Sequence, residues 1–102
     1  MTDFIAVYDL KKTTPSPYSE FINQAENRGW SRWIWGPKNG KWLKLPNTTL
    51  IGDFSSAEAA KNAFDQAVAA AGQAIGLKVV VEKHLIATYE ARSYSSDEKA
   101  DS

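Results

Sequence analysis

Residues 4–10 read Phe-Ile-Ala-Val-Tyr-Asp-Leu. The segment is short, apolar and rich in residues that favour β-structure, and a basic, Thr/Pro/Ser-rich stretch follows it, so it predicts a buried strand. Because successive side chains of a strand point to opposite faces, Ile5 and Val7 share one face. The other face carries Phe4, Ala6, Tyr8 and Leu10. Both faces are apolar, so the rest of the fold must cover both.

Two amphipathic helices are predicted after this strand. Ser16 followed by a proline suits a helix N-terminus, and apolar residues spaced i, i+3, i+4 and i+7 predict a helix over residues 17–28. A capping box that starts at Ser55, with Gly76 as the stop, predicts a second helix over residues 56–74. Their apolar faces consist of Tyr18, Phe21, Ile22 and Ala25 in the first helix and of Ala60, Phe64, Ala67, Val68, Ala71 and Ile75 in the second.

The remaining segments predict strands. Residues 30–45 hold two apolar, aromatic runs around a turn rich in Gly, Pro and Asn, which indicates a β-hairpin or one long strand with an inserted loop. Residues 48–54 form another strand. Residues 77–90 are strand-like throughout, and a strand is usually only about 5–6 residues long. We therefore expect either one long strand here or two shorter strands with a bend near His84.

The resulting order, β-α-β-β-α-β, is the ferredoxin-like α+β arrangement, with two helices on one face of an antiparallel sheet. We expect one such domain over residues 1–92, with its C-terminal strand extended, and a flexible acidic tail over residues 93–102. The helices cover only one face of the first strand. A second copy of the protein is the simplest cover for the other face, and the long last strand can pair with the partner's sheet edge, so we expect a homodimer.

The composition excludes several classes of protein. The chain has 102 residues and zero formal net charge at pH 7, which suits one ordinary globular domain. It has no cysteine, which excludes disulfides, thiolate metal sites and cysteine nucleophiles. No apolar run approaches the ~20 residues of a membrane span, and the start of the chain lacks the features of a signal peptide. We expect a cytoplasmic protein without membrane contact.

The strand ending Tyr8-Asp9-Leu10, with the order of elements over residues 4–90, resembles the superfamily of small CRISPR-associated adaptation subunits. The resemblance implies a ferredoxin-like homodimer that is either a metal-dependent nuclease on RNA or DNA or a protein without catalysis. It implies that Asp9 lies at the dimer axis opposite its twin, where paired carboxylates can hold Mg²⁺ or Mn²⁺. The arginines that the family often carries on the first helix are missing from residues 18–21. From the residues alone, Asp9 can instead shape the turn after the strand.

The best functional signal lies in the predicted hairpin. All four tryptophans fall within residues 30–42, and residues 28–46 contain five basic residues and no acidic one. Nucleic-acid surfaces combine cations for phosphates with flat rings that stack on bases. We therefore predict that RNA or DNA binds through Arg28, Arg32, Trp35, Lys38, Lys41, Trp42 and Lys44. The alternative is that the tryptophans are core or dimer contacts and that the lysines keep an edge hairpin soluble.

Few groups in the chain suit catalysis. His84 is the single histidine, it has no partner at a telling spacing, and we expect it at the surface or in an interface. Asp53 precedes the second helix, where an acid suits the helix dipole. We expect a non-catalytic dimeric binding module that needs no cofactor. Two alternatives stay open: a metal-dependent nuclease, and a regulator of a protein partner, such as an antitoxin or an adaptor.

Overall fold

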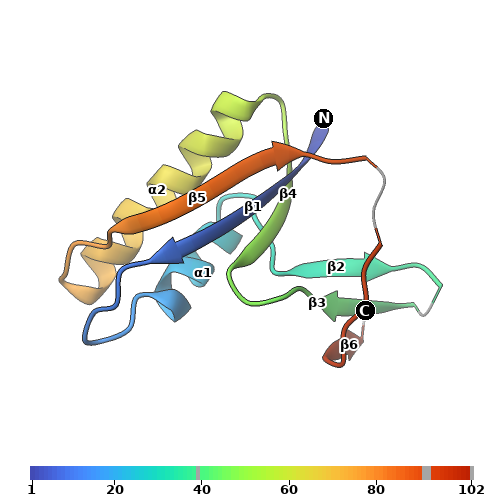
Figure 1. The fold of residues 1–102 in the computed structure, drawn as a ribbon, viewed down its shortest axis with the longest axis horizontal. Coiled ribbons are helices and arrows are strands. Elements are labelled where there is room, and N and C mark those ends of the chain that lie inside the picture. Colours follow the sequence, from blue (N-terminus) through green and yellow to red (C-terminus); the bar gives the residue numbers. More distant parts are fainter. Residues whose placement is uncertain (39, 91–92, 102) are drawn as a thin grey trace.

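The computed structural model describes residues 1–38, 40–90 and 93–101 of the chain. Within these residues the protein is an α+β structure with two antiparallel sheets of three strands each. Its elements, in chain order, are β1 (Thr2–Leu10), α1 (Tyr18–Glu26), β2 (Trp33–Gly36), β3 (Lys41–Lys44), β4 (Thr49–Phe54), α2 (Ala57–Ile75), β5 (Val81–Thr88) and β6 (Lys99–Asp101). In Figure 1 the hairpin of β2 and β3 projects from one end of the molecule, away from the helices.

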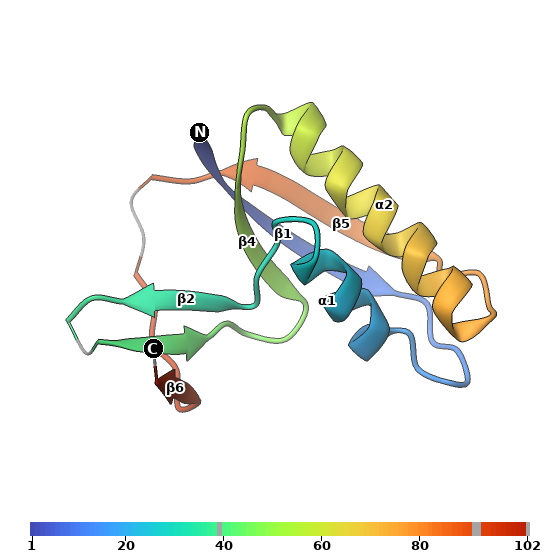
Figure 2. The same ribbon diagram turned by 180° about the vertical axis from the view of Figure 1, so that it is seen from behind.

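The larger sheet has the strand order β4-β1-β5, and β1 is antiparallel to both neighbours. Both helices pack on the same face of this sheet (Figure 1 and Figure 2). One of the two apolar faces of β1 points into the core, where its four side chains are at most 3% exposed: Phe4, Ala6, Tyr8 and Leu10. The ring centroid of Tyr8 lies 4.9 Å from that of Phe21 and 5.8 Å from that of Phe64, so both helices meet β1 in one aromatic core.

The first predicted helix is confirmed as α1. Pro17 occupies the N-cap position, and the hydroxyl oxygen of the predicted cap, Ser16, accepts a long hydrogen bond of 3.5 Å from the Tyr18 nitrogen. The Tyr18 hydroxyl in turn accepts a hydrogen bond from the Leu10 nitrogen (3.0 Å) and donates one to the Leu10 oxygen (3.1 Å). These two bonds attach the start of α1 to the end of β1.

The second predicted helix is confirmed as α2, and the serine that caps it is one residue later than predicted. Ser56, rather than Ser55, accepts a hydrogen bond from the Ala59 nitrogen at 3.0 Å, because its extended backbone aims the side chain at the first turn. Gly76 ends the helix with φ of 73°, as predicted. Among the described residues, neither helix has the length and apolar character needed to cross a membrane.

The chain leaves the larger sheet between α1 and β2. Ser31 forms a single antiparallel bridge with Ile51 of β4, with both N···O distances at 2.8 Å. A Cβ atom on Gly52 would lie only 2.5 Å from the carbonyl oxygen of Gly29, so glycine is required where this connection crosses β4. After the bridge the chain turns away and forms β2, which pairs with β3 in the smaller sheet, as the predicted hairpin requires.

The last strand of the larger sheet is shorter than the predicted run of residues 77–90. β5 begins at Val81, and its register against β1 shifts between the pairs Asp9–Lys83 and Leu10–Val81. The preceding Val79 is only 6% exposed and belongs to the core. Val79, two residues before β5, therefore fills the core instead of extending the sheet.

Candidate functional site

Three of the four tryptophans lie on one face of the hairpin. The register of β2 and β3 sets Trp35 directly opposite Trp42, and their rings meet edge to face with centroids 5.2 Å apart. Trp33 is two residues before Trp35 and therefore shares its face. Trp35 and Trp42 are 36% and 39% exposed, which is high for such large apolar side chains. We call the surface of Trp33, Trp35 and Trp42 the tryptophan face.

The fourth tryptophan has a different role. Trp30 is 1% exposed, and its ring centroid lies 4.8 Å from that of Phe54 in the core. Its indole Nε1 is buried without a hydrogen-bond partner among the described residues. The core interpretation therefore holds for Trp30, whereas the other three tryptophans line the hairpin.

A small hollow opens on the tryptophan face. Its volume is about 220 Å³, and Ser31, Trp33, Trp42 and Ala100 line it. Ala100 belongs to β6, so the C-terminal part of the chain forms one wall. The hollow is open, and Trp33, Trp42 and Ala100 make its lining mostly apolar. Such a lining suits the edge of a flat ring better than a compact polar ligand.

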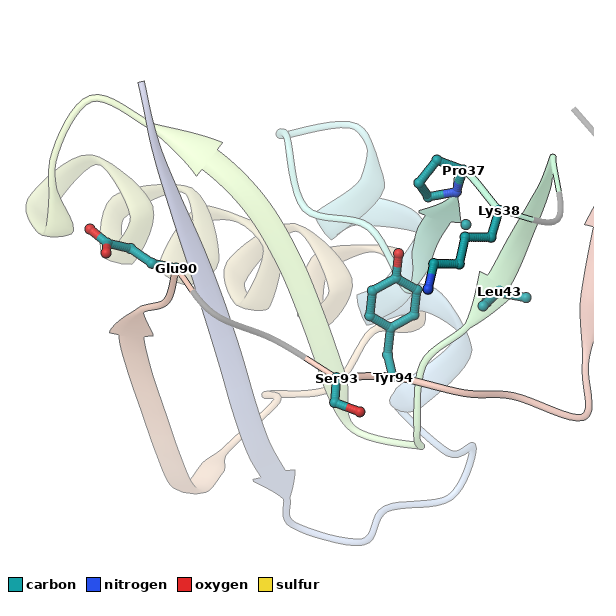
Figure 3. Close-up of a pocket in the computed structure, with 7 residues that line it drawn as sticks. Pro37, Lys38, Leu43, Glu90, Ser93 and Tyr94 are labelled. Atoms are coloured by element: carbon teal, nitrogen blue, oxygen red, sulfur yellow. The ribbon is translucent and has the colours of Figure 1, made fainter.

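The lysines of the hairpin divide between its two faces. Lys44 lies opposite Trp33 and so emerges on the tryptophan face, where its Nζ atom is 3.1 Å from the Glu98 carboxylate. Lys41 lies opposite Gly36, on the reverse face. Lys38 is in the turn and lines a hollow of about 530 Å³ on that reverse side, together with Tyr94 (Figure 3).

The two predicted arginines lie in different surroundings. The Nη1 atom of Arg28 donates to the Gln24 carbonyl oxygen (3.0 Å) and to the Gln24 side-chain oxygen (2.9 Å), which completes the end of α1. Arg32 lines a cavity of about 50 Å³ beside Tyr8 and Ile22, and its Nε atom is buried without a partner among the described residues. The structure therefore brings Trp35, Trp42 and Lys44 together on one face, sets Arg32 beside Lys44 in this cavity, and holds Arg28 at the end of α1.

The sequence interpretation missed the contact between the C-terminal residues and the hairpin. β6 pairs antiparallel with β3, setting Lys99 opposite Leu43 and Ala100 opposite Trp42. The Tyr94 hydroxyl donates to the Trp35 carbonyl oxygen at 3.0 Å. The signal that could have revealed this contact was Tyr94 itself, a large aromatic residue in a segment otherwise made of small and charged residues.

The face of the larger sheet that the helices leave uncovered is apolar at its centre. Directly paired residues of adjacent strands share a face, so the register defines this surface. Ile5 pairs with Ile51 on one side and with Ala87 on the other, and Val7 pairs with Leu85. The Val7 side chain is 40% exposed and the Leu85 side chain 61%. We call the surface of Ile5, Val7, Ile51, Leu85 and Ala87 the open sheet face. It confirms that both faces of β1 are apolar.

Charged residues stand at both ends of the open sheet face. At one end Asp3 pairs with Asp53, and a hydrogen bond between the two carboxyl groups, which protonated Asp53 donates to Asp3, raises the pKa of Asp53. At the other end Asp9 pairs with Lys83. No group of three or more His, Asp or Glu side chains gathers among residues 1–38, 40–90 and 93–101, so the metal role of Asp9 stays a prediction. His84 is exposed, with its ring 5.9 Å from that of Phe64.

Comparison with known proteins identifies no relative. No protein-family model matches the chain, and no curated protein and no solved structure shows significant similarity to it. The function must therefore be argued from the geometry of the tryptophan face and the open sheet face.

Proposed function

We propose that this protein is a non-catalytic, homodimeric binding module that holds single-stranded nucleic acid, RNA or DNA, on its tryptophan face. One observation carries the proposal: the exposed edge-to-face pair of Trp35 and Trp42. As an edge-to-face pair the two indoles stabilise the hairpin, and the parts of both rings that remain in water form an apolar surface, which indicates a surface that is covered in use. A base stacked on an aromatic side chain contributes about 1–3 kcal/mol, and every base offers such a flat surface.

The charges around the pair favour a polyanion. Lys44 shares the tryptophan face, and Lys38 and Lys41 lie at the turn end of the same hairpin. No acidic residue occurs from residue 28 to residue 46. Bases are available for stacking on the indoles only when they are unpaired, so a single strand suits this surface better than a duplex.

The topology is compatible with a ferredoxin-like domain, and we extend the proposal to the fold. The order β4-β1-β5, with two helices on one face, matches three adjacent strands of that arrangement. The Ser31–Ile51 bridge on the outer edge of β4 stands where the fourth strand belongs. In this interpretation the fourth strand is reduced to one bridge because the chain departs at once into the hairpin.

The proposed dimer uses the open sheet face, with a second copy of the chain as its occupant. A two-fold axis in the plane of the interface and perpendicular to the strands would reverse the strand direction between the copies. Val7 and Ile5 of one copy would then pack against the Ile5 and Val7 side chains of the partner. The Asp9–Lys83 end of each copy would face the Asp3–Asp53 end of the other.

Calorimetric titration with short single-stranded RNA and DNA, and with a duplex of the same sequence, tests the binding function. We expect the wild type to bind single strands at low salt and Trp35→Ala or Trp42→Ala to weaken that binding by about 1–3 kcal/mol, since each removes a stacking surface. Neutralising Lys38, Lys41 and Lys44 together should lower the salt slope by roughly one unit for each phosphate that the variant no longer neutralises.

Two control variants match these changes. Trp30→Phe alters a tryptophan of the core and should lower stability while leaving the affinity of the folded protein unchanged. Lys78→Gln removes an exposed lysine before β5 and should leave the salt slope unchanged. Absence of binding at low salt, or equal losses in the hairpin variants and their controls, would contradict the proposal.

A further inference from the structure

The C-terminal residues occupy the hairpin at the place where the proposed ligand has to bind. In Figure 1, β6 lies beneath β3 and the chain leading to it crosses the hairpin. The backbone N–H of Lys44 donates a hydrogen bond of 3.0 Å to the backbone carbonyl oxygen of Glu98. The Lys44 Nζ atom also forms an ion pair with the Glu98 carboxylate at 3.1 Å. We refer to residues 95–101 as the acidic segment, because they contain Asp97, Glu98 and Asp101 and only one basic residue, Lys99.

We infer that the acidic segment acts as an internal competitor, which nucleic acid displaces from β3 when it binds the tryptophan face. The inference rests on the proposed function and adds its regulation. The Glu98 carboxylate holds the one lysine that shares the tryptophan face, in the position that a phosphate would need. Ala100 lies opposite Trp42 and forms a wall of the hollow beside Trp33, so it also narrows access to the indoles.

The acidic segment is weakly held, as a displaceable competitor must be. β6 has three residues, and Asp97, Glu98 and Lys99 are exposed. Ion pairs in such exposed positions contribute little to stability, and short strands on a sheet edge open more readily than a core strand. A ligand that brings several phosphates and two bases has more contacts to offer the hairpin than Glu98 and Ala100 together.

Tyr94 limits how far the segment can move. Its side chain is partly buried in the hollow on the reverse face (Figure 3). Its hydroxyl donates a hydrogen bond of 3.0 Å to the Trp35 carbonyl oxygen. The reverse face also carries Ile34 and Leu43, which are 7% and 5% exposed. Displacement of residues 95–101 alone therefore frees Lys44 and the flank of Trp42, while the Tyr94 anchor remains on the hairpin.

The test compares two variants that each lose one acid and free one lysine. Glu98→Gln removes the partner of Lys44, whereas Asp65→Asn removes the partner of Lys61 on the exposed side of α2. In calorimetric titrations with a single-stranded oligonucleotide, we expect Glu98→Gln to bind several-fold more tightly than the wild type, with a salt slope steeper by about one unit. Asp65→Asn has the same net charge and should bind as the wild type does.

Hydrogen exchange at the Lys44 amide provides the second measurement, because that amide is bonded to Glu98. We expect saturating oligonucleotide to accelerate its exchange in the wild type, and Ala100→Pro, which cannot extend the pairing of β6, to accelerate it without ligand. If the wild type binds but both acid variants match it and the Lys44 amide stays protected, the competitor is disproved and the binding function stands. If no variant binds, both ideas fail together. Binding by Glu98→Gln alone supports both.

Discussion

Tyr8 couples the stability of this protein to alkaline pH. Its ring lies in the core between Phe21 and Phe64. Burial, with a smaller contribution from neighbouring Tyr18, raises the pKa of its phenol from the ordinary 10.0 to about 12, although Arg32 acts in the opposite direction. The folded protein therefore keeps this proton at a pH where the unfolded chain has lost it, and folding becomes less favourable as the pH rises.

We expect the wild type to lose stability between about pH 10 and pH 12 that the Tyr8→Phe variant retains, since the variant keeps the ring and has no proton to lose. Two units of pKa correspond to about 2–3 kcal/mol at most. The measurement is the free energy of urea unfolding as a function of pH, with the difference between the two proteins as the readout. Parallel curves for the two proteins across this range would show that Tyr8 ionises as easily in the folded state as in the unfolded chain.

Ser55 and Ser56 form a natural pair for measuring a helix cap. Ser56→Ala should lower the free energy of unfolding by about 1 kcal/mol, because the Ala59 nitrogen loses its acceptor. Ser55→Ala, one residue earlier, should change it by no more than a few tenths of that value. Thermal or urea unfolding of the two variants is sufficient, and the prediction is wrong if the larger loss belongs to Ser55→Ala.

Among the elements, the helices and the strands around β1 could be predicted because each follows from a local pattern. The apolar spacing that includes Phe21 and Ala25 holds whatever α1 packs against, and the alternation of β1 fixes which side chains share a face. The choice between Ser55 and Ser56 lay beyond this reasoning. Either serine can serve as a cap, and only the backbone conformation before the helix selects one of them.

The site was harder to predict because it depends on contacts between distant residues. Lys44 and Glu98 are 54 positions apart, and β6 has no apolar alternation that would announce a strand. A count of charges in the sequence also does not show which way each side chain points. Arg28 was therefore included in the predicted surface, although its guanidinium donates to Gln24. The i,i+4 spacing of those two residues within the predicted helix already indicated that their side chains could interact with each other.

At the scale of the whole molecule, the open sheet face predicts self-association. Sedimentation at micromolar concentration should give twice 11.3 kDa for the wild type. Leu85→Lys, at the most exposed apolar position of that face, should give a monomer, since burying a lysine against an apolar surface is unfavourable. Leu77→Lys is the matched control, because Leu77 is also exposed but lies beside α2, away from the open sheet face. A monomeric wild type, or equal behaviour of the two variants, would rule out this interface.

The unequal placement of the four indoles gives the protein a built-in optical probe. An indole among apolar groups emits at shorter wavelength than one in water, because polar solvent relaxes around its excited state. Trp30 therefore supplies a blue component of the emission spectrum, and Trp35 and Trp42 supply a redder one. A base stacked on the hairpin quenches only the red component, whereas denaturation moves the blue component to longer wavelength. One unlabelled sample thus reports occupancy and unfolding in separate parts of the same spectrum.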